Sequence, residues 1–227
     1  MLILALLLAP GCVPLPRSEA REAFRGETVI LLHGMGRSRA SMALLARRFR
    51  QAGYRTVNFP YRQGAKSLDV ITDELLATVA RETKGGRYHL VGHSLGSIII
   101  RNGFKKGYPP GLGRIVMLAP PNHPARLAIK FKQNPLYRWI TGDSGQKLAE
   151  AAFYAGLPTP SVEFGVIAGD KGTKLLSAEP NDGIVLVEDT KLAGMRDFVV
   201  LHHAHTFIMN GRDTFERCRR FLELGLF

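Results

Sequence analysis

The chain of 227 residues is long enough for one domain with a single sizeable core, and its 45% hydrophobic and 22% charged residues are ordinary for a globular protein. Its 31 Lys and Arg against 19 Asp and Glu give a net charge of +12, yet the basic residues are scattered and no nucleic-acid recognition signature accompanies them. Nucleic-acid binding is therefore not expected, and two cysteines are too few for a disulfide framework.

The N-terminus has the pattern of a processed leader. Residues 2–9 form an apolar run of eight that is too short to span a bilayer, and it resembles the apolar region of a secretory signal. Ala9-Pro10-Gly11-Cys12 resembles a bacterial lipobox, with Cys12 as the lipidated residue. Residues 1–25 are therefore predicted to be a leader and tether of an exported, periplasmic or lipid-anchored protein. A frayed apolar start on a cytoplasmic protein is the alternative.

From Thr28 onward, strand-like and helix-like segments alternate. The expected strands are 28–32, 54–59, 88–91, 113–118, 162–168 and 198–201, and the expected helices are 40–52, 68–83, 97–106 and 206–224. This alternation predicts an α/β fold, in which a mostly parallel central sheet carries helices on both faces. Residues 26–227 would form one domain, interrupted at about 122–160 by a short helical lid insertion.

Gly92-His93-Ser94-Leu95-Gly96 lies between a strand-like run and a helix-like run. A Gly-x-Ser-x-Gly pattern in that context is typical of the nucleophile elbow of a serine hydrolase. The turn is so sharp that the serine takes a strained backbone, and the glycines stand where any Cβ would collide. Ser94 is therefore the predicted nucleophile.

Four motifs in this order make the chain resemble the α/β-hydrolase superfamily, on its bacterial lipase and esterase side, from residue 28 to the C-terminus. They are His33-Gly34-Met35, the Ser94 elbow, Asn181-Asp182-Gly183 and His205-Thr206-Phe207. The resemblance implies a lipase-type or esterase-type hydrolase that cleaves carboxylic esters through an acyl-Ser94 intermediate. It implies no cofactor, and no histidine spacing indicates a metal site. Acyl transfer by the same residues and a non-catalytic, hydrolase-fold lipoprotein are the alternatives.

The resemblance places the catalytic base after the last strand, where His202, His203 and His205 compete. His205 is favoured because His-Thr-Phe at the start of the final helix resembles the family pattern, whereas His202 and His203 could be structural. The other histidines have different expected places: His93 packed beneath the elbow, His33 bracing the His-Gly loop, His89 on the elbow strand and His123 at the start of the insertion.

The triad acid should follow the penultimate strand, and Asp170, Asp182, Glu188 and Asp189 are the candidates. Asp182 is favoured, because its Asp-Gly turn resembles that of bacterial lipases and presents the carboxylate. Asp170 directly follows strand 162–168 and is the runner-up. An ordinary surface turn at Asp182 is the remaining interpretation.

The oxyanion that forms during attack needs preorganised donors, and the backbone N–H groups of Leu95 and Met35 are expected to supply them. The insertion mixes apolar and basic residues, which fits a lid over an acyl pocket or against anionic lipid. A helix packed on the sheet edge fits equally. The expected partners are an ester or lipid substrate, with membrane-surface association as a further expectation.

Overall fold

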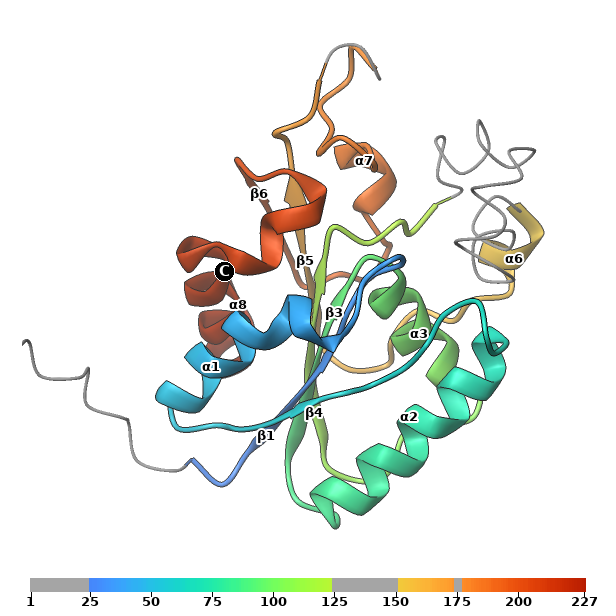
Figure 1. Ribbon diagram of the computed structural model, residues 1–227, viewed down its shortest axis with the longest axis vertical. Helices are drawn as coiled ribbons and strands as arrows, with labels where there is room; N and C mark the ends of the chain where they lie inside the picture. Colours follow the sequence, from blue (N-terminus) through green and yellow to red (C-terminus); the bar gives the residue numbers. More distant parts are fainter. Residues whose placement is uncertain (1–24, 124–150, 174–176) are drawn as a thin grey trace, which may run out of the picture.

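The computed structural model of the chain describes residues 25–123, 151–173 and 177–227. Within them, six strands form one sheet in the order β2-β1-β3-β4-β5-β6, and every neighbouring pair is parallel (Figure 1). The strands are β1 (Thr28–Leu32), β2 (Arg55–Asn58), β3 (Tyr88–His93), β4 (Leu112–Leu118), β5 (Phe164–Gly169) and β6 (Asp197–Leu201). The predicted α/β fold with a parallel sheet is confirmed.

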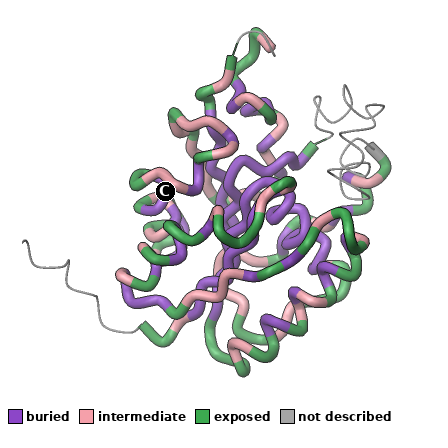
Figure 2. The backbone as a smooth tube through the Cα atoms, viewed as in Figure 1, coloured by how far each residue is buried: buried purple, intermediate pink, exposed green. Residues whose placement is uncertain are grey.

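Helices cover both faces of this sheet. α2 (Leu68–Thr83) and α3 (Leu95–Gly103) lie on one face, whereas α1 (Ala43–Gln51) and α8 (Arg212–Leu224) lie on the other (Figure 1). Alternate residues of a strand therefore enter different cores: Ile30 and Leu32 of β1 pack with α2 and α3, and Val29 and Leu31 pack with α1 and α8. Burial on both faces explains the uninterrupted apolar strands, which form the purple centre of Figure 2.

The structure also contains several short helical elements. They are the 3-10 helix η1 (Arg39–Met42), α6 (Ala151–Ala155), α7 (Val187–Thr190) and the 3-10 helix η2 (His205–Asn210). The helix predicted for 68–83 is confirmed to the residue. Its start is fixed by Ser67, whose side-chain oxygen caps the first turn by accepting from the Val70 N–H. The predicted helix 40–52 starts with the 3-10 turn η1, and the one predicted for 97–106 begins at Leu95.

The single helix predicted for 206–224 is wrong, because the chain breaks between η2 and α8. Gly211 has an extended ψ of 140° at the break. The Arg48 guanidinium donates to the carbonyls of Asn210 and Gly211, both at 2.8 Å, and so satisfies groups that a continuous helix would use internally. A distant side chain thus ends the first segment, and local sequence periodicity does not report such a contact.

Several sequence-based expectations fall outside the described residues. These include the leader with Cys12 and most of the insertion, so the lid stays a prediction. Cys218 lies buried in α8, where burial raises the pKa of its thiol. In the parts of the chain that the structure describes, no helix has the length and apolar character needed to cross a bilayer.

Candidate functional site

Ser94 occupies a strained turn between β3 and α3. Its φ of 51° and ψ of −120° are unfavourable for any residue with a side chain. The flanking glycines make the turn possible: a Cβ at Gly96 would lie 2.6 Å from the Leu32 carbonyl oxygen, and one at Gly92 would lie 2.7 Å from the Ser97 nitrogen. The Gly-x-Ser-x-Gly pattern therefore has the tight geometry that the sequence predicts.

Hydrogen bonds fix the elbow at the carboxyl edge of the sheet. The Ser94 N–H donates to the Leu118 carbonyl of β4 at 2.9 Å, and the Ser97 hydroxyl donates to the Gly92 carbonyl at 2.9 Å. Ser94 is 8% exposed, so it is largely buried but still reaches the molecular surface. In parallel sheets, this edge is where ligands bind.

His205 and Asp182 form a buried pair in the same part of the molecule. The distance between His205 Nδ1 and Asp182 Oδ2 is 2.7 Å, and the two side chains are 7% and 1% exposed. The backbone N–H of His205 also donates to the Asp182 carbonyl at 2.9 Å. A carboxylate held on Nδ1 keeps the proton there and leaves Nε2 as the acceptor.

The Asp-Gly turn orients the Asp182 carboxylate. Its Oδ1 accepts from the backbone N–H groups of Ile184 and Val185, at 2.9 and 2.7 Å, while Oδ2 faces His205. Donors on both oxygens hold the group in one rotamer. Asp182 is therefore no ordinary surface turn residue.

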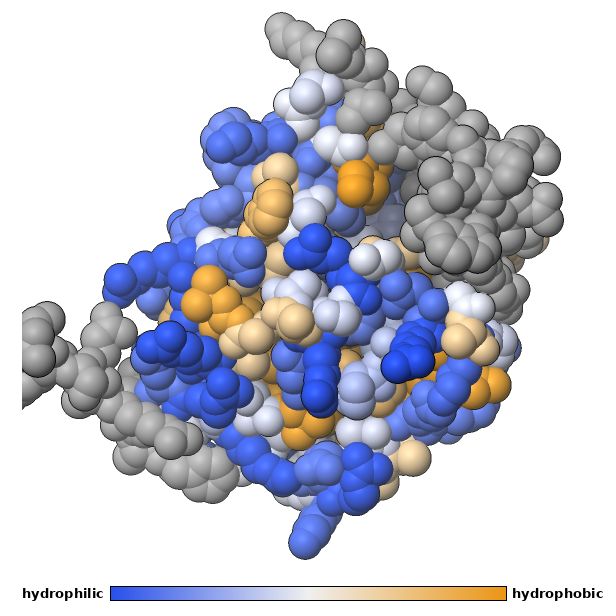
Figure 3. All heavy atoms as spheres, viewed as in Figure 1, coloured by the Kyte–Doolittle hydropathy of each residue, from blue (hydrophilic) through white to orange (hydrophobic). Residues whose placement is uncertain are grey.

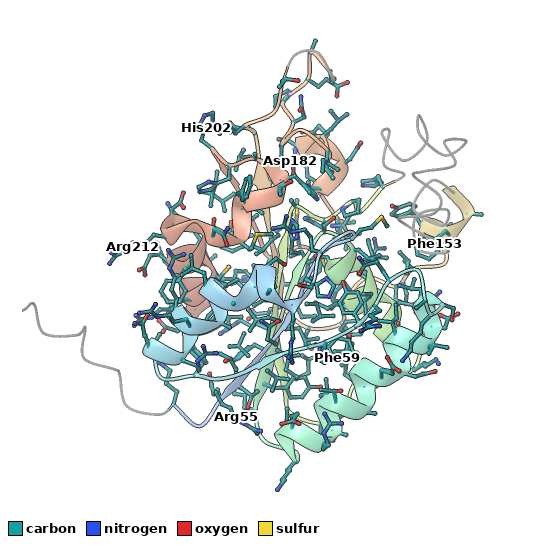
Figure 4. The ribbon with its side chains drawn as sticks, in the orientation of Figure 1. Arg55, Phe59, Phe153, Asp182, His202 and Arg212 are labelled. Atoms are coloured by element: carbon teal, nitrogen blue, oxygen red, sulfur yellow. The ribbon has the colours of Figure 1, made fainter. Side chains whose placement is uncertain are left out.

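The competing acids and histidines pair elsewhere. Asp170 contacts His202 at 2.9 Å with side chains that are 39% and 75% exposed, and His203 contacts Asp213 at 2.7 Å. Figure 4 shows His202 at the outer edge of the molecule and Asp182 further in. Of the other candidate acids, Glu188 pairs with the exposed Lys191, and the Asp189 carbonyl accepts from the N–H groups of Asn122 and His123.

His93 connects the elbow to the segment of His205. Its Nε2 donates to the His205 carbonyl at 3.0 Å, and the two ring centroids lie 4.9 Å apart. Burial, with the nearby charge of His205, holds the pKa of His93 well below 6.5, so the ring is neutral. Its Nδ1 has no hydrogen-bond partner and faces Gly34, where a Cβ would lie 2.7 Å away.

The loop after β1 passes closely beside the serine. A Cβ at Gly34 would lie 3.2 Å from Ser94 Cβ, so only glycine permits this approach. His33 braces the loop, as expected from the sequence, by bonding the Gly34 carbonyl through Nδ1 and stacking on Tyr61 with centroids 3.9 Å apart. Among the described residues, the backbone N–H groups of Met35 and Leu95 donate to no backbone carbonyl.

His89 lies away from this group, at the start of β3. Its Nε2 bonds Glu27 at 3.2 Å, and its Nδ1 accepts from the Arg114 N–H at 2.9 Å. Both ring nitrogens are thus used in structural contacts. In the described ranges, no three His, Cys, Asp or Glu side chains gather in an arrangement able to hold a metal ion.

Arg101 is a buried residue that sequence analysis missed. It lies on α3, is 3% exposed, and its guanidinium donates to the carbonyls of Leu157 and Pro158 and to Asn122 Oδ1. Burial lowers its pKa to about 10. The available signal was a charged residue directly after the apolar run Ile98–Ile100.

Comparisons with known proteins bear on the family and the fold of the chain. The model of the family described as "Alpha/beta hydrolase family" matches residues 29–216. A 2-hydroxy-6-oxo-6-phenylhexa-2,4-dienoate hydrolase of Comamonas testosteroni is 36% identical over 110 residues. That match covers 44% of this chain and 38% of the relative, so the chain spans well under half of that relative's length.

Solved structures with the same fold include three bacterial hydrolases. The mature form of a Bacillus licheniformis lipase has a TM-score of 0.68 at 21% identity, over 94% of this chain and 96% of the lipase. An esterase of Exiguobacterium antarcticum has a TM-score of 0.63 at 16% identity, over 87% and 92%. A phospholipase of Legionella pneumophila has a TM-score of 0.66 at 16% identity, over 87% and 59%. At these identities the likeness shows the fold alone.

Proposed function

Since the chain belongs to the alpha/beta hydrolase family, we propose that it is a serine hydrolase that cleaves carboxylic esters, with Ser94, His205 and Asp182 as its catalytic triad. The buried His205–Asp182 pair carries this proposal, because it belongs to the segment that His93 ties to the strained serine elbow. The exposed Asp170–His202 pair lacks that burial and that connection.

The proposed reaction has two halves. In the first, the Ser94 hydroxyl oxygen attacks the ester carbonyl carbon while His205 Nε2 takes the hydroxyl proton. The resulting imidazolium is stabilised by the Asp182 carboxylate on Nδ1. As the tetrahedral intermediate collapses, the ester C–O bond breaks, and the departing alcohol receives the proton from His205. The acyl group remains on Ser94.

Water completes the turnover. His205 removes a proton from the water molecule, whose oxygen attacks the acyl carbon, and the bond to Ser94 breaks as the proton returns to the serine oxygen. In both halves, the carbonyl oxygen becomes negative and needs donors. The N–H groups of Leu95, at the start of α3, and of Met35, beside Gly34, are the proposed donors.

Exposed apolar side chains favour an ester with an apolar part, or a lipid. Phe207 is 60% exposed and follows His205 by two residues, and Ile184 is 44% exposed and follows Asp182 by two residues. In Figure 3, orange and tan groups interrupt a largely blue face. We propose that Phe207 and Ile184 form an apolar rim that contacts the substrate and adjoins a membrane surface. The names of the structural neighbours, which include lipases, an esterase and a phospholipase, point to the same substrates.

A fluorophosphonate probe tests the nucleophile, because it phosphonylates only activated serines. The native protein should be labelled, and Ser94→Ala should abolish labelling while circular dichroism reports an intact fold. Ser161→Ala, at an exposed serine that precedes β5 and lies outside both proposed sites, should label normally. Labelling of the Ser94→Ala protein, or none of the folded native protein, would refute the proposal. Hydrolysis of 4-nitrophenyl esters of increasing chain length, with and without an added alcohol, then separates hydrolysis from acyl transfer.

A further inference from the structure

Three arginines lie on the two loops next to the serine elbow. Arg37 belongs to the loop after β1, Arg39 starts η1, and Arg62 belongs to the loop after β2. Arg37 is half-buried and the other two are exposed. Within the described ranges, no carboxylate pairs with any of the three, although most arginines elsewhere in those ranges have such partners.

The backbone holds Arg37 close to Ser94. The Arg37 N–H donates to the Gly34 carbonyl at 3.3 Å, and the Gln63 side chain donates to the Arg37 carbonyl at 3.4 Å. Gly34 itself abuts Ser94 Cβ. Three residues span at most about 10 Å, so the Arg37 side chain starts within reach of a substrate bound at the serine.

An open depression lies beside Arg37. Its volume is about 640 Å³, and its lining includes Arg37, Ser38 and Ser41 on one side and Asn210 at the end of η2 on the other. Since η2 begins at His205, the depression is bordered by the two segments that carry the proposed base and one proposed oxyanion donor. The Ser41 hydroxyl donates to the Ser38 carbonyl at 2.8 Å, whereas the Ser38 oxygen only accepts from the Ala40 N–H and keeps its own proton available. The Arg37 guanidinium and the Ser38 hydroxyl therefore form a donor set suited to carboxylate or phosphate oxygens.

The positive charge of Arg37 influences two histidines of the site. Burial is the main cause that lowers the pKa values of His33 and His93, and the positive charge of Arg37 adds to it in both cases. An unpaired cation with this influence would attract a substrate of opposite charge.

We propose that Arg37 binds an anionic group, a carboxylate or a phosphate, carried by the ester substrate, and that Arg39 and Arg62 strengthen the attraction. This inference rests on the proposed ester hydrolysis and names the substrate class: esters that bear a negative charge in the acyl or the alcohol part. A guanidinium with a hydroxyl beside it binds such a group through charge-assisted hydrogen bonds, whereas a neutral ester gains nothing from it.

Matched esters test the specificity. The carboxylate arm compares mono(4-nitrophenyl) adipate with 4-nitrophenyl hexanoate, and the phosphate arm compares 1-oleoylglycerol 3-phosphate with 1-oleoylglycerol. The native protein should prefer the anionic member of at least one pair. Arg37→Gln should lower kcat/KM for that ester about tenfold or more, mainly through KM, and leave the neutral ester within about twofold. Arg37→Lys should retain part of the preference, and Arg47→Gln, an exposed arginine of α1, should retain all of it.

A binding measurement separates this inference from the proposed catalysis. Calorimetric titration with hexyl phosphate and with hexanoate needs no turnover, and binding should disappear in Arg37→Gln but persist in Arg47→Gln. If neutral esters are cleaved but neither anion binds and no anionic ester is preferred, the anion site is refuted and the hydrolase proposal stands. If an anion binds through Arg37 but no ester is cleaved, the hydrolase proposal fails alone. An equal loss of kcat/KM for the anionic and the neutral ester of a matched pair in Arg37→Gln also overturns the inference.

Discussion

At the scale of single residues, the pairing of carboxylates with histidines decides which acid belongs to the site. Asp170 and Asp182 both follow β5, and each contacts a histidine. Burial distinguishes them, because an ion pair in water is screened, whereas a buried carboxylate stabilises an adjacent imidazolium strongly. The motif favoured Asp182, but the sequence could not reveal this contrast, since it depends on which loop covers which pair.

Substitution of the two aspartates by asparagine tests this contrast. Asp182→Asn should lower kcat by about 10⁴-fold, because an amide on Nδ1 no longer fixes the tautomer or stabilises the imidazolium. Asp170→Asn should leave kcat within about twofold, since the Asp170–His202 pair is exposed. Steady-state hydrolysis of a 4-nitrophenyl ester measures both effects. A comparable loss in both variants would remove Asp182 from its proposed role.

A second residue-scale prediction concerns the neutral His93 ring. Because its pKa is depressed by burial in the folded protein, the unfolded chain binds more protons below pH 6.5. The group therefore leaves the stability unchanged well above pH 6.5 and destabilises the folded state progressively as the pH falls below 6.5. Between pH 6.5 and 5.5, this one group should cost about 1 kcal/mol in the free energy of unfolding.

Urea unfolding at the two pH values measures that loss. His93→Gln, which retains a donor for the His205 carbonyl, should reduce the loss by about 1 kcal/mol. His202→Gln, a change at a largely exposed side chain, should leave the difference between the two pH values as it is in the native protein. An unchanged pH difference in His93→Gln would contradict the depressed pKa.

At the scale of elements, apolar runs predicted the sheet and its helices because a parallel sheet buries both faces. β1 and α2 match the prediction to the residue. The errors have two causes. A tertiary contact from Arg48 separates η2 from α8, and the short helix α7 was missed because its four residues carry no helical period. The nucleophile elbow was predictable because its tight turn requires glycine two residues before and two residues after the serine, whereas the His205–Asp182 contact joins separate loops.

Arg101 shows how one side chain can join several elements. It links α3, which begins at the serine elbow, to the backbone on both sides of residues 124–150. Arg101→Met should lower the free energy of unfolding by about 3 kcal/mol, because the carbonyls of Leu157 and Pro158 lose their donor. Lys105→Met, at an exposed position just after the end of α3, should change it by less than about 0.5 kcal/mol. Urea unfolding of both variants tests the difference, and equal stability of Arg101→Met and the native protein would refute it.

At the scale of the whole molecule, the net charge of +12 and the proposed apolar rim would both favour adsorption to an anionic membrane. An anionic membrane attracts a basic protein over about one Debye length, and exposed apolar side chains then add contact with the acyl region. Neither feature alone gives stable adsorption, because charge is screened by salt and single apolar side chains bury little area. Together they predict binding that needs both negative lipid and the rim.

Co-sedimentation with vesicles tests this combination. The protein should bind phosphatidylglycerol vesicles in low salt, bind phosphatidylcholine vesicles weakly, and lose most of its binding at about 0.5 M NaCl. Phe207→Ser should weaken binding to the anionic vesicles several-fold, since it removes the most exposed apolar side chain near His205. Leu224→Ser is the matched control, because Leu224 is similarly exposed, at 62%, but lies at the end of α8. That end of α8 contacts Arg114 near the start of β4, at the edge of the sheet opposite to His205. Equal weakening by both substitutions would show that adsorption does not orient the rim toward the membrane.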